Sequence, residues 1–146
     1  DTILLGLSDA AIDFVSYFGI TAAINANNVT QFEVGVGGDV IQFSDLSLAV
    51  DAGAFTAGTA VTFSTVALKA DTANEIIVDT IANLGALGVT IGNESTNTTN
   101  VHQIAIASDT GAIFYDADGD WTGLSVQIGD LDVTTGLTVD NVAIIA

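Results

Sequence analysis

Short runs of alternating apolar residues, separated at regular intervals by turn residues, dominate the last third of the chain. Residues 102–106 alternate in this way, and an Asp-Thr-Gly turn at 109–111 separates them from the apolar run at 113–115. A second, acidic turn at 116–120 leads to another alternating run at 124–128. Apolar side chains at every second position place one face of a strand against a core, so this region predicts a β-meander.

The rest of the chain carries the same signals with one ambiguous segment. A Gly-Gly-Asp sequence at 37–39 lies between two apolar runs, which predicts a turn between strands. We expect an opening helix capped by Ser8 and Asp9 and ended by Gly19, or an apolar strand in its place. Residues 81–87 predict a short helix that ends near Gly88. Three further apolar runs predict strands at 61–68, 76–78 and 139–145.

These patterns predict a mainly β fold, a β-sandwich or roll of antiparallel strands with one or two short helices. The 146 residues suffice for one domain with its own core. We expect a single domain over 1–146, with an apolar N-terminal segment at 1–28, helical or an exchanged strand, and a β core at 29–146. No exact internal repeat is visible.

The charge is strongly one-sided, because 18 Asp and Glu residues face a single Lys and the net charge is −17. A nucleic-acid surface needs Lys and Arg to neutralise phosphates, so nucleic acid is excluded as a partner. Anionic lipid is disfavoured for the same reason. The longest uncharged run, 14–32, is interrupted by polar residues and predicts no membrane insertion. With 49% hydrophobic residues, the chain can nevertheless bury enough surface to fold.

The densest acidic cluster is Asp116, Asp118 and Asp120, within the sequence YDADGDW at 115–121. Alternating carboxylates on a tight loop supply the hard oxygen ligands that Ca²⁺ prefers. The spacing departs from the EF-hand pattern, which needs Gly at loop position 6 and Glu at position 12. Two interpretations stay open: an Asp-Gly hairpin turn, or a cation site that binds Ca²⁺.

Asp39 is the second candidate calcium ligand. It lies in GVGGDVIQF at 35–43, a single imperfect copy of the nonapeptide that forms calcium-binding β-rolls. Such a site needs stacked copies that share ions, so one copy is a weak indication.

Catalytic signals are sparse. His102 is the only histidine, and it lies in an alternating strand pattern. The chain has no Cys, no G-x-S-x-G nucleophile elbow and no phosphate-binding loop. We therefore expect no enzyme, and a small acidic hydrolase that uses Asp116, Asp118 or His102 is the least favoured alternative.

Three sequons, at Asn28, Asn93 and Asn97, fit the N-glycosylation pattern. Such triplets also arise by chance in a chain rich in Asn and Thr. Sugars on them require an exported protein in an organism with the glycosylation machinery.

Three segments resemble the C-terminal regions of RTX, or hemolysin-type calcium-binding, secreted bacterial proteins. Residues 29–46 (VTQFEVGVGGDVIQFSDL) resemble the segment that closes the repeat roll of that family. Residues 112–119 (AIFYDADG) resemble a hairpin of the same regions, and 137–145 (LTVDNVAII) resemble their final residues. The matches cover about a third of the chain and follow the family's order.

The resemblance implies an exported or cell-surface bacterial protein that leaves by a type I route and folds with the help of Ca²⁺. The calcium-binding repeat array is absent from this sequence, so its ion sites are not carried over. A saline habitat accounts for the same acidity without calcium.

Our leading hypothesis is a non-enzymatic secreted structural module, calcium-binding or calcium-responsive, that supports an extracellular filament or surface layer. Sheet edges are normally protected by Lys and Pro, and this chain has one Lys and no Pro. We therefore expect self-association through sheet edges, with a strand formed by the apolar residues Ile3, Leu4, Leu5 and Leu7 added to a neighbouring subunit. The alternative is a C-terminal folding cap and export signal of a larger RTX-type protein, without an assembly role.

Overall fold

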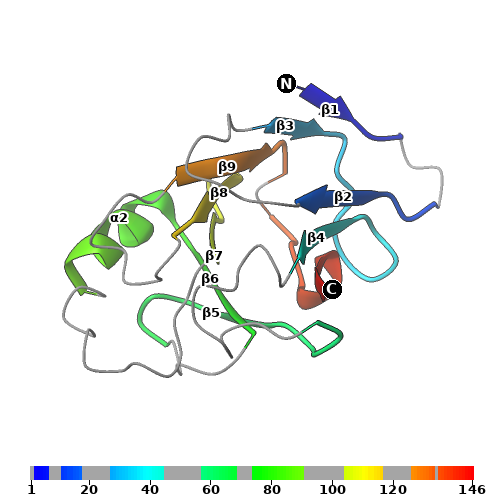
Figure 1. Cartoon of the computed structure of the whole chain (residues 1–146). Coiled ribbons are helices and arrows are strands. Elements are labelled where there is room, and N and C mark those ends of the chain that lie inside the picture. Colours follow the sequence, from blue (N-terminus) through cyan, green and yellow to red (C-terminus); the bar gives the residue numbers. More distant parts are fainter. Residues whose placement is uncertain are drawn as a thin grey trace.

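The computed structural model describes residues 2–6, 11–17, 27–44, 57–68, 74–90, 104–116, 126–133 and 135–146. Strands account for most of the regular structure in these residues, and one α-helix and one 3-10 helix complete it (Figure 1). The strands are β1 (Thr2–Leu4), β2 (Phe14–Tyr17), β3 (Asn27–Thr30), β4 (Val40–Ser44), β5 (Thr62–Ser64), β6 (Glu75–Asp79), β7 (Ile104–Ala107), β8 (Ala112–Tyr115), β9 (Val126–Leu131) and β10 (Val142–Ile145). The helices are α2 (Ile81–Thr90) and η2 (Val139–Asn141).

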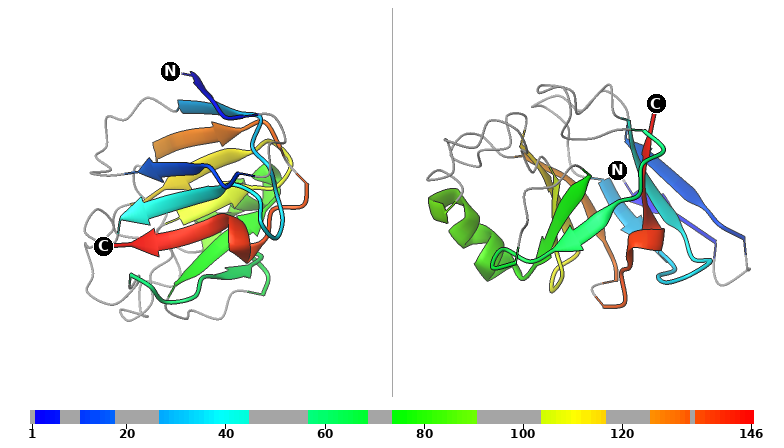
Figure 2. Two further views of the ribbon diagram at one scale, coloured as in Figure 1. Left: turned by 90° about the vertical axis from the view of Figure 1, so that its right-hand side faces the viewer. Right: turned by 90° about the horizontal axis from the view of Figure 1, so that it is seen from below.

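The strands form two sheets that pack against each other (Figure 2). The larger sheet has seven strands in the order β1-β3-β9-β8-β7-β6-β5, and the smaller has three in the order β10-β4-β2. This confirms the prediction of a mainly β fold with few short helices.

The chain passes from the large sheet to the small sheet three times in the same way. β1, β3 and β9 are neighbours in the large sheet, and the strands that follow them, β2, β4 and β10, are neighbours in the small sheet. All four pairings within these two sets are parallel. We call the successive strand pairs coil 1 (β1 and β2), coil 2 (β3 and β4) and coil 3 (β9 and β10). Together they form a short two-sheet roll.

Strands β5 to β8 and helix α2 lie between coil 2 and coil 3 in the sequence and extend the large sheet. β5, β6 and β7 pair in parallel, whereas β8 is antiparallel to both β7 and β9. The predicted meander is therefore confirmed for β7, β8 and β9. The predicted strand at 76–78 is β6.

Helix α2 confirms the helix expected at 81–87 and continues two residues beyond Gly88. Its first turn is anchored by side chains, because the Ile81 N–H donates to Asp109 Oδ1 at 2.8 Å and the Asn83 N–H donates to Thr80 Oγ1 at 3.3 Å. Leu84 is buried against the large sheet, in a second apolar cluster with Ala105 and Ala107. No helix in the described part of the chain is long and apolar enough to cross a membrane.

The main core lies between the two sheets and is built from aligned rows of apolar side chains. Parallel register places equivalent residues of the three coils beside one another, so each row contains one side chain from each coil. The aromatic rings of Tyr17 and Phe43 stack at a centroid distance of 5.5 Å. The rows are Val15, Ile41 and Val142; Tyr17, Phe43 and Ile144; and, from the large sheet, Ile3, Val29 and Leu131.

The expected antiparallel pairing is wrong for most of the described strands, since six of their eight pairings are parallel. For the four pairings within the coils, the reason is the crossing between sheets: a chain that leaves a sheet and returns to the same side re-enters it in the same direction. The turn at 37–39 accordingly links β3 of the large sheet to β4 of the small sheet rather than two strands of one sheet.

Three other expectations need adjustment. The opening segment forms a strand at 14–17, in agreement with the second of its two interpretations, while Ser8, Asp9 and Gly19 lie outside the described residues. The strand expected at 61–68 is confined to β5, because residues 66–68 form a turn. In the C-terminal run, residues 139–141 form the 3-10 helix η2 before β10 begins.

Candidate functional site

The predicted calcium loop is described only at its first carboxylate. Asp116 directly follows β8 and is 2% exposed, whereas Asp118 and Asp120 lie outside the described residues. Burial and the neighbouring carboxylate of Asp116 both raise the pKa of Tyr115. The described residues contain no group of three His, Cys, Asp or Glu side chains that could hold a metal ion.

Asp39, the other predicted calcium ligand, connects two coils of the roll. It is 2% exposed and immediately precedes β4. Its Oδ1 accepts a hydrogen bond from the Asp13 N–H of coil 1 at 3.0 Å, and its Oδ2 accepts one from the Glu33 N–H of its own turn at 2.8 Å. Carboxylates that accept backbone N–H groups stabilise otherwise unpaired donors in turns. In this structure, Asp39 therefore has a connecting role.

Asn141 of coil 3 also lies immediately before a strand of the small sheet, β10, one residue beyond the position that aligns with Asp39, and is fully buried. Its Nδ2 donates to Asp39 O at 2.8 Å, and also to the carbonyl oxygens of Glu33 and Gly35, both at 3.3 Å. Its Oδ1 accepts from the Gly35 N–H at 2.8 Å and from the Thr138 N–H at 3.1 Å. One amide side chain thus ties coil 3 to the turn of coil 2.

Asp13 is the equivalent residue of coil 1, immediately before β2. Its Oδ2 accepts a hydrogen bond from the Gly6 N–H of its own turn at 3.2 Å, as Asp39 does from the Glu33 N–H. We call Asp13, Asp39 and Asn141 the turn ladder. A further link comes from Asp132, whose carboxylate accepts from the backbone N–H groups of Gln31 and Phe32.

Sequence reasoning missed the turn ladder, although a signal for it exists. The five-residue pattern Asp-x-apolar-x-apolar, in which x is any residue, recurs at 13–17 (DFVSY), 39–43 (DVIQF) and 140–144 (DNVAI). The strand register aligns these three segments, since Val15 and Val142 both pair with Ile41. In coil 3 the connecting side chain is the next residue, Asn141. The repeat is degenerate, and 96 residues of intervening sequence separate its second and third copies.

The residues expected to mediate assembly lie at an edge of the large sheet. Ile3 and Leu4 belong to β1, the terminal strand, and Leu5 follows it with its N–H donating to Thr30 O at 3.1 Å. Ile3 and Leu5 pack against the core, whereas the Leu4 side chain is 70% exposed. Leu7 lies outside the described residues.

One described sequon can be placed. Asn28 lies in β3, between β1 and β9, with an exposed side chain. Asn93 and Asn97 lie outside the described residues, as do His102 and Lys69.

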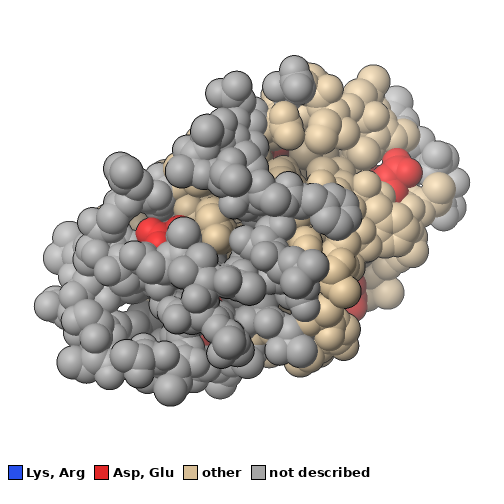
Figure 3. Space-filling view, viewed as in Figure 1, with Lys and Arg blue, Asp and Glu red and all other residues tan. Residues whose placement is uncertain are grey.

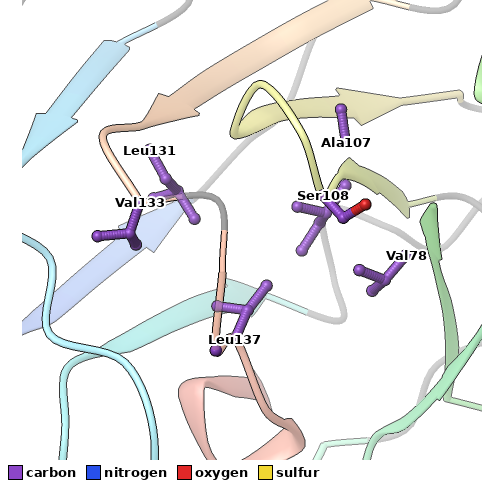
Figure 4. A pocket seen from close by; sticks show the side chains of 8 residues that line it. Val78, Ala107, Ser108, Leu131, Val133 and Leu137 are labelled. Atoms are coloured by element: carbon purple, nitrogen blue, oxygen red, sulfur yellow. The ribbon is translucent and has the colours of Figure 1, made fainter. Parts of the chain in front are cut away.

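A small hollow of about 130 Å³ opens at the side of the core (Figure 4). Its described lining is apolar apart from Ser108 and contains no titratable side chain. It offers no group for acid, base or metal chemistry in that lining. The lining residues are Val78, Ile106, Ala107, Ser108, Leu131, Val133, Gly136 and Leu137.

The described acidic side chains lie in separate patches on the face shown in Figure 3. Copies of a chain with a net charge of −17 repel one another unless cations screen the charge.

Comparison with known proteins identifies no relative, because no family model, curated protein or solved structure matches the chain.

Proposed function

We propose that this chain is a non-enzymatic structural module of a secreted or cell-surface bacterial protein, which binds or responds to Ca²⁺ and supports an extracellular assembly. The observation that carries the proposal is the end of the roll at coil 1. Among the described strands, both sheets terminate there in β1 and β2, which contain no charged residue and expose apolar side chains. Edges of this kind add strands from other chains.

The proposed response to calcium is based on the negative charge of the chain. Eighteen acidic residues and one Lys make copies of the chain repel one another, and a divalent cation both screens and bridges carboxylates. The loop at 116–120 is the densest group of carboxylates in the sequence. We assign the calcium response to Asp116, Asp118 and Asp120, with Asp39 acting as a coil connector.

Light scattering and circular dichroism, in parallel titrations with CaCl₂ and with NaCl at matched ionic strength, test this proposal. We expect a gain in particle size that is specific to Ca²⁺. Asp118→Asn and Asp120→Asn should weaken the response, whereas Asp140→Asn, which removes the same charge from an exposed site, should leave it intact. Equal responses to the two salts would reduce the effect to charge screening and would remove calcium from the proposal.

The asymmetry of the roll favours a second candidate, the folding cap of a larger RTX-type protein. No described strand pairs with the outer edges of coil 1, whereas in coil 3 the edge of β9 is covered by β8. A roll that is open at one end and covered at the other has the form of a terminal cap. The reading frame that encodes the chain distinguishes the two candidates, because a cap requires calcium-binding repeats and an effector domain upstream of Asp1.

A further inference from the structure

The edge of coil 1 is the place where both layers of the roll end side by side. β1 is the terminal strand of the large sheet and β2 is the terminal strand of the small sheet, and the chain connects one directly to the other. The opposite edge of the large sheet, at β5, involves that sheet alone, because the small sheet ends at β10. Coil 1 therefore presents two adjacent rows of backbone donors and acceptors.

The two strands of this edge contain no charged residue and expose apolar side chains. Leu4 is 70% exposed, Phe14 is 59% exposed and Ile12, directly before the turn residue Asp13, is 46% exposed. The strand sequences TIL and FVSY carry no charge, although the chain has 18 acidic residues. Because carboxylates on two copies repel each other, two copies approach most easily through surfaces that lack them.

A second copy of the chain cannot stack on coil 3 in the way that coil 1 stacks on coil 2. In the large sheet, β9 pairs with β8 on the side away from β3. In the small sheet, Ile144 O of β10 accepts a hydrogen bond from the Gly58 N–H at 3.1 Å. Head-to-tail stacking, which would extend both sheets at once, is therefore blocked by the chain itself.

From these observations we infer that two copies of this chain pair through coil 1 around a two-fold axis. β1 lies antiparallel to the partner subunit's β1, and β2 lies antiparallel to the partner subunit's β2, so each sheet continues across the axis. An isologous contact of this kind uses the same surface twice and closes, which makes the product a dimer rather than an open filament. The inference rests on the proposed assembly function and names its first contact, which is then the building block of any larger, calcium-bridged assembly.

Mass measurement by size-exclusion chromatography with light scattering tests the inference, on the full chain in EDTA and in CaCl₂. We expect a dimer at about 0.1 mM chain in both conditions. Leu4→Lys should shift the mass to that of a monomer, since a charge on an edge strand opposes pairing. Leu68→Lys, at a side chain that is 75% exposed in the turn after β5, should keep the dimer. Each substitution makes the net charge less negative by the same amount, so weaker global repulsion cannot explain a loss of the dimer.

Single cysteines test the two-fold geometry, because the chain has no other Cys. Under mild oxidation, Leu4→Cys should form a reducible covalent dimer, since equivalent side chains lie close together across an antiparallel strand pair near a two-fold axis. Leu68→Cys should remain largely monomeric on non-reducing gels. Equal cross-linking of the two variants would overturn the geometry.

The outcomes separate the inference from the proposed function. A monomer in both EDTA and CaCl₂ overturns the inference, as does a dimer that Leu4→Lys leaves unchanged. Calcium-specific particles that form equally well with Leu4→Lys overturn the coil 1 contact and leave the proposed function standing. A dimer without any calcium-specific growth supports the contact and removes calcium from the proposed function.

Discussion

Asp39 Oδ1 accepts a hydrogen bond from the backbone N–H of Asp13 at 3.0 Å, although 26 residues separate the two in the chain. The two aspartates have the same place in successive coils, immediately before a strand of the small sheet. Each also accepts a hydrogen bond from its own turn. The Asp13–Asp39 contact connects the described turns of coils 1 and 2.

Removing the Asp39 carboxylate should destabilise the fold strongly. Asp39→Ala leaves the N–H groups of Asp13 and Glu33 without their acceptor, and each such loss costs about 1–3 kcal/mol. We expect the free energy of unfolding, measured by urea denaturation, to fall by about 2–4 kcal/mol. Asp140→Ala, at an exposed carboxylate in η2, serves as the control and should change it by less than about 0.5 kcal/mol. A similar small change for both variants would contradict the connecting role.

Asn141→Asp should be destabilising in a way that depends on pH. The Nδ2 group donates to three carbonyl oxygens, and a carboxylate would place negative charge against them in a buried site. We expect a loss of about 2–4 kcal/mol at neutral pH, measured by urea denaturation.

The sign of this pH dependence follows from linkage. The introduced carboxyl group should have a raised pKa in the folded state, so folding binds a proton, and the deficit relative to wild type should shrink as the pH falls. Asn141→Ala, which introduces no charge, should show a deficit that is the same at every pH. A flat deficit for Asn141→Asp would argue against burial of the charge.

Tyr17 should make the protein less stable at high pH. Burial, with a smaller contribution from the Asp130 carboxylate, raises the pKa of Tyr17 to about 12 from its usual value of 10.0. The folded state then holds the phenol proton more tightly than the unfolded state, so its contribution is complete below pH 10 and is lost as the pH rises from about 10 to 12. The loss amounts to about 3 kcal/mol. Thermal or urea unfolding of Tyr17→Phe between pH 9 and about pH 12 should lack this component, and an unchanged slope would refute the assignment.

Gly129 and Tyr17 should be energetically coupled. A Cβ atom on Gly129 would overlap the Tyr17 hydroxyl group, and it would also come within 3.3 Å of Ile113 Cδ1. Gly129→Ala should therefore destabilise the protein by about 1–3 kcal/mol, as overpacking of a core does. In the Tyr17→Phe background the hydroxyl is gone, and the cost should be smaller by at least about 0.5 kcal/mol. Additive effects in this double-mutant cycle would show that the two sites do not interact.

The sequence pattern identified many of the strands correctly but paired most of them wrongly. Alternation at 104–106 and 126–128 predicted strands. The turn at 109–111 is short, so the two strands that it joins, β7 and β8, pair with each other in antiparallel orientation. The turn at 37–39 carries similar residues, yet it leads from β3 in one sheet to β4 in the other. Local turn chemistry is compatible with both outcomes, and contacts distant in sequence choose between them.

The candidate site was likewise predicted from the sequence only in part. Asp39 was singled out for its glycine-rich surroundings, and its position in a turn before a strand is confirmed. Its partners, Asp13 and Asn141, were not predicted, because they are 26 and 102 residues away in sequence and only the stacking of coils brings them together.

The sequence by itself determined that this chain is mainly β, that a helix lies near residue 81, and that the net charge is strongly negative. These properties depend on side-chain periodicity and composition, which act locally or as sums over the chain. Only the tertiary structure decided that the three coils stack in parallel, that Asp39 connects them, and that coil 1 is an edge with which no other described strand pairs. Strand pairing is a competition between distant segments for the same backbone hydrogen bonds, and its result is determined by the packing of all of them together.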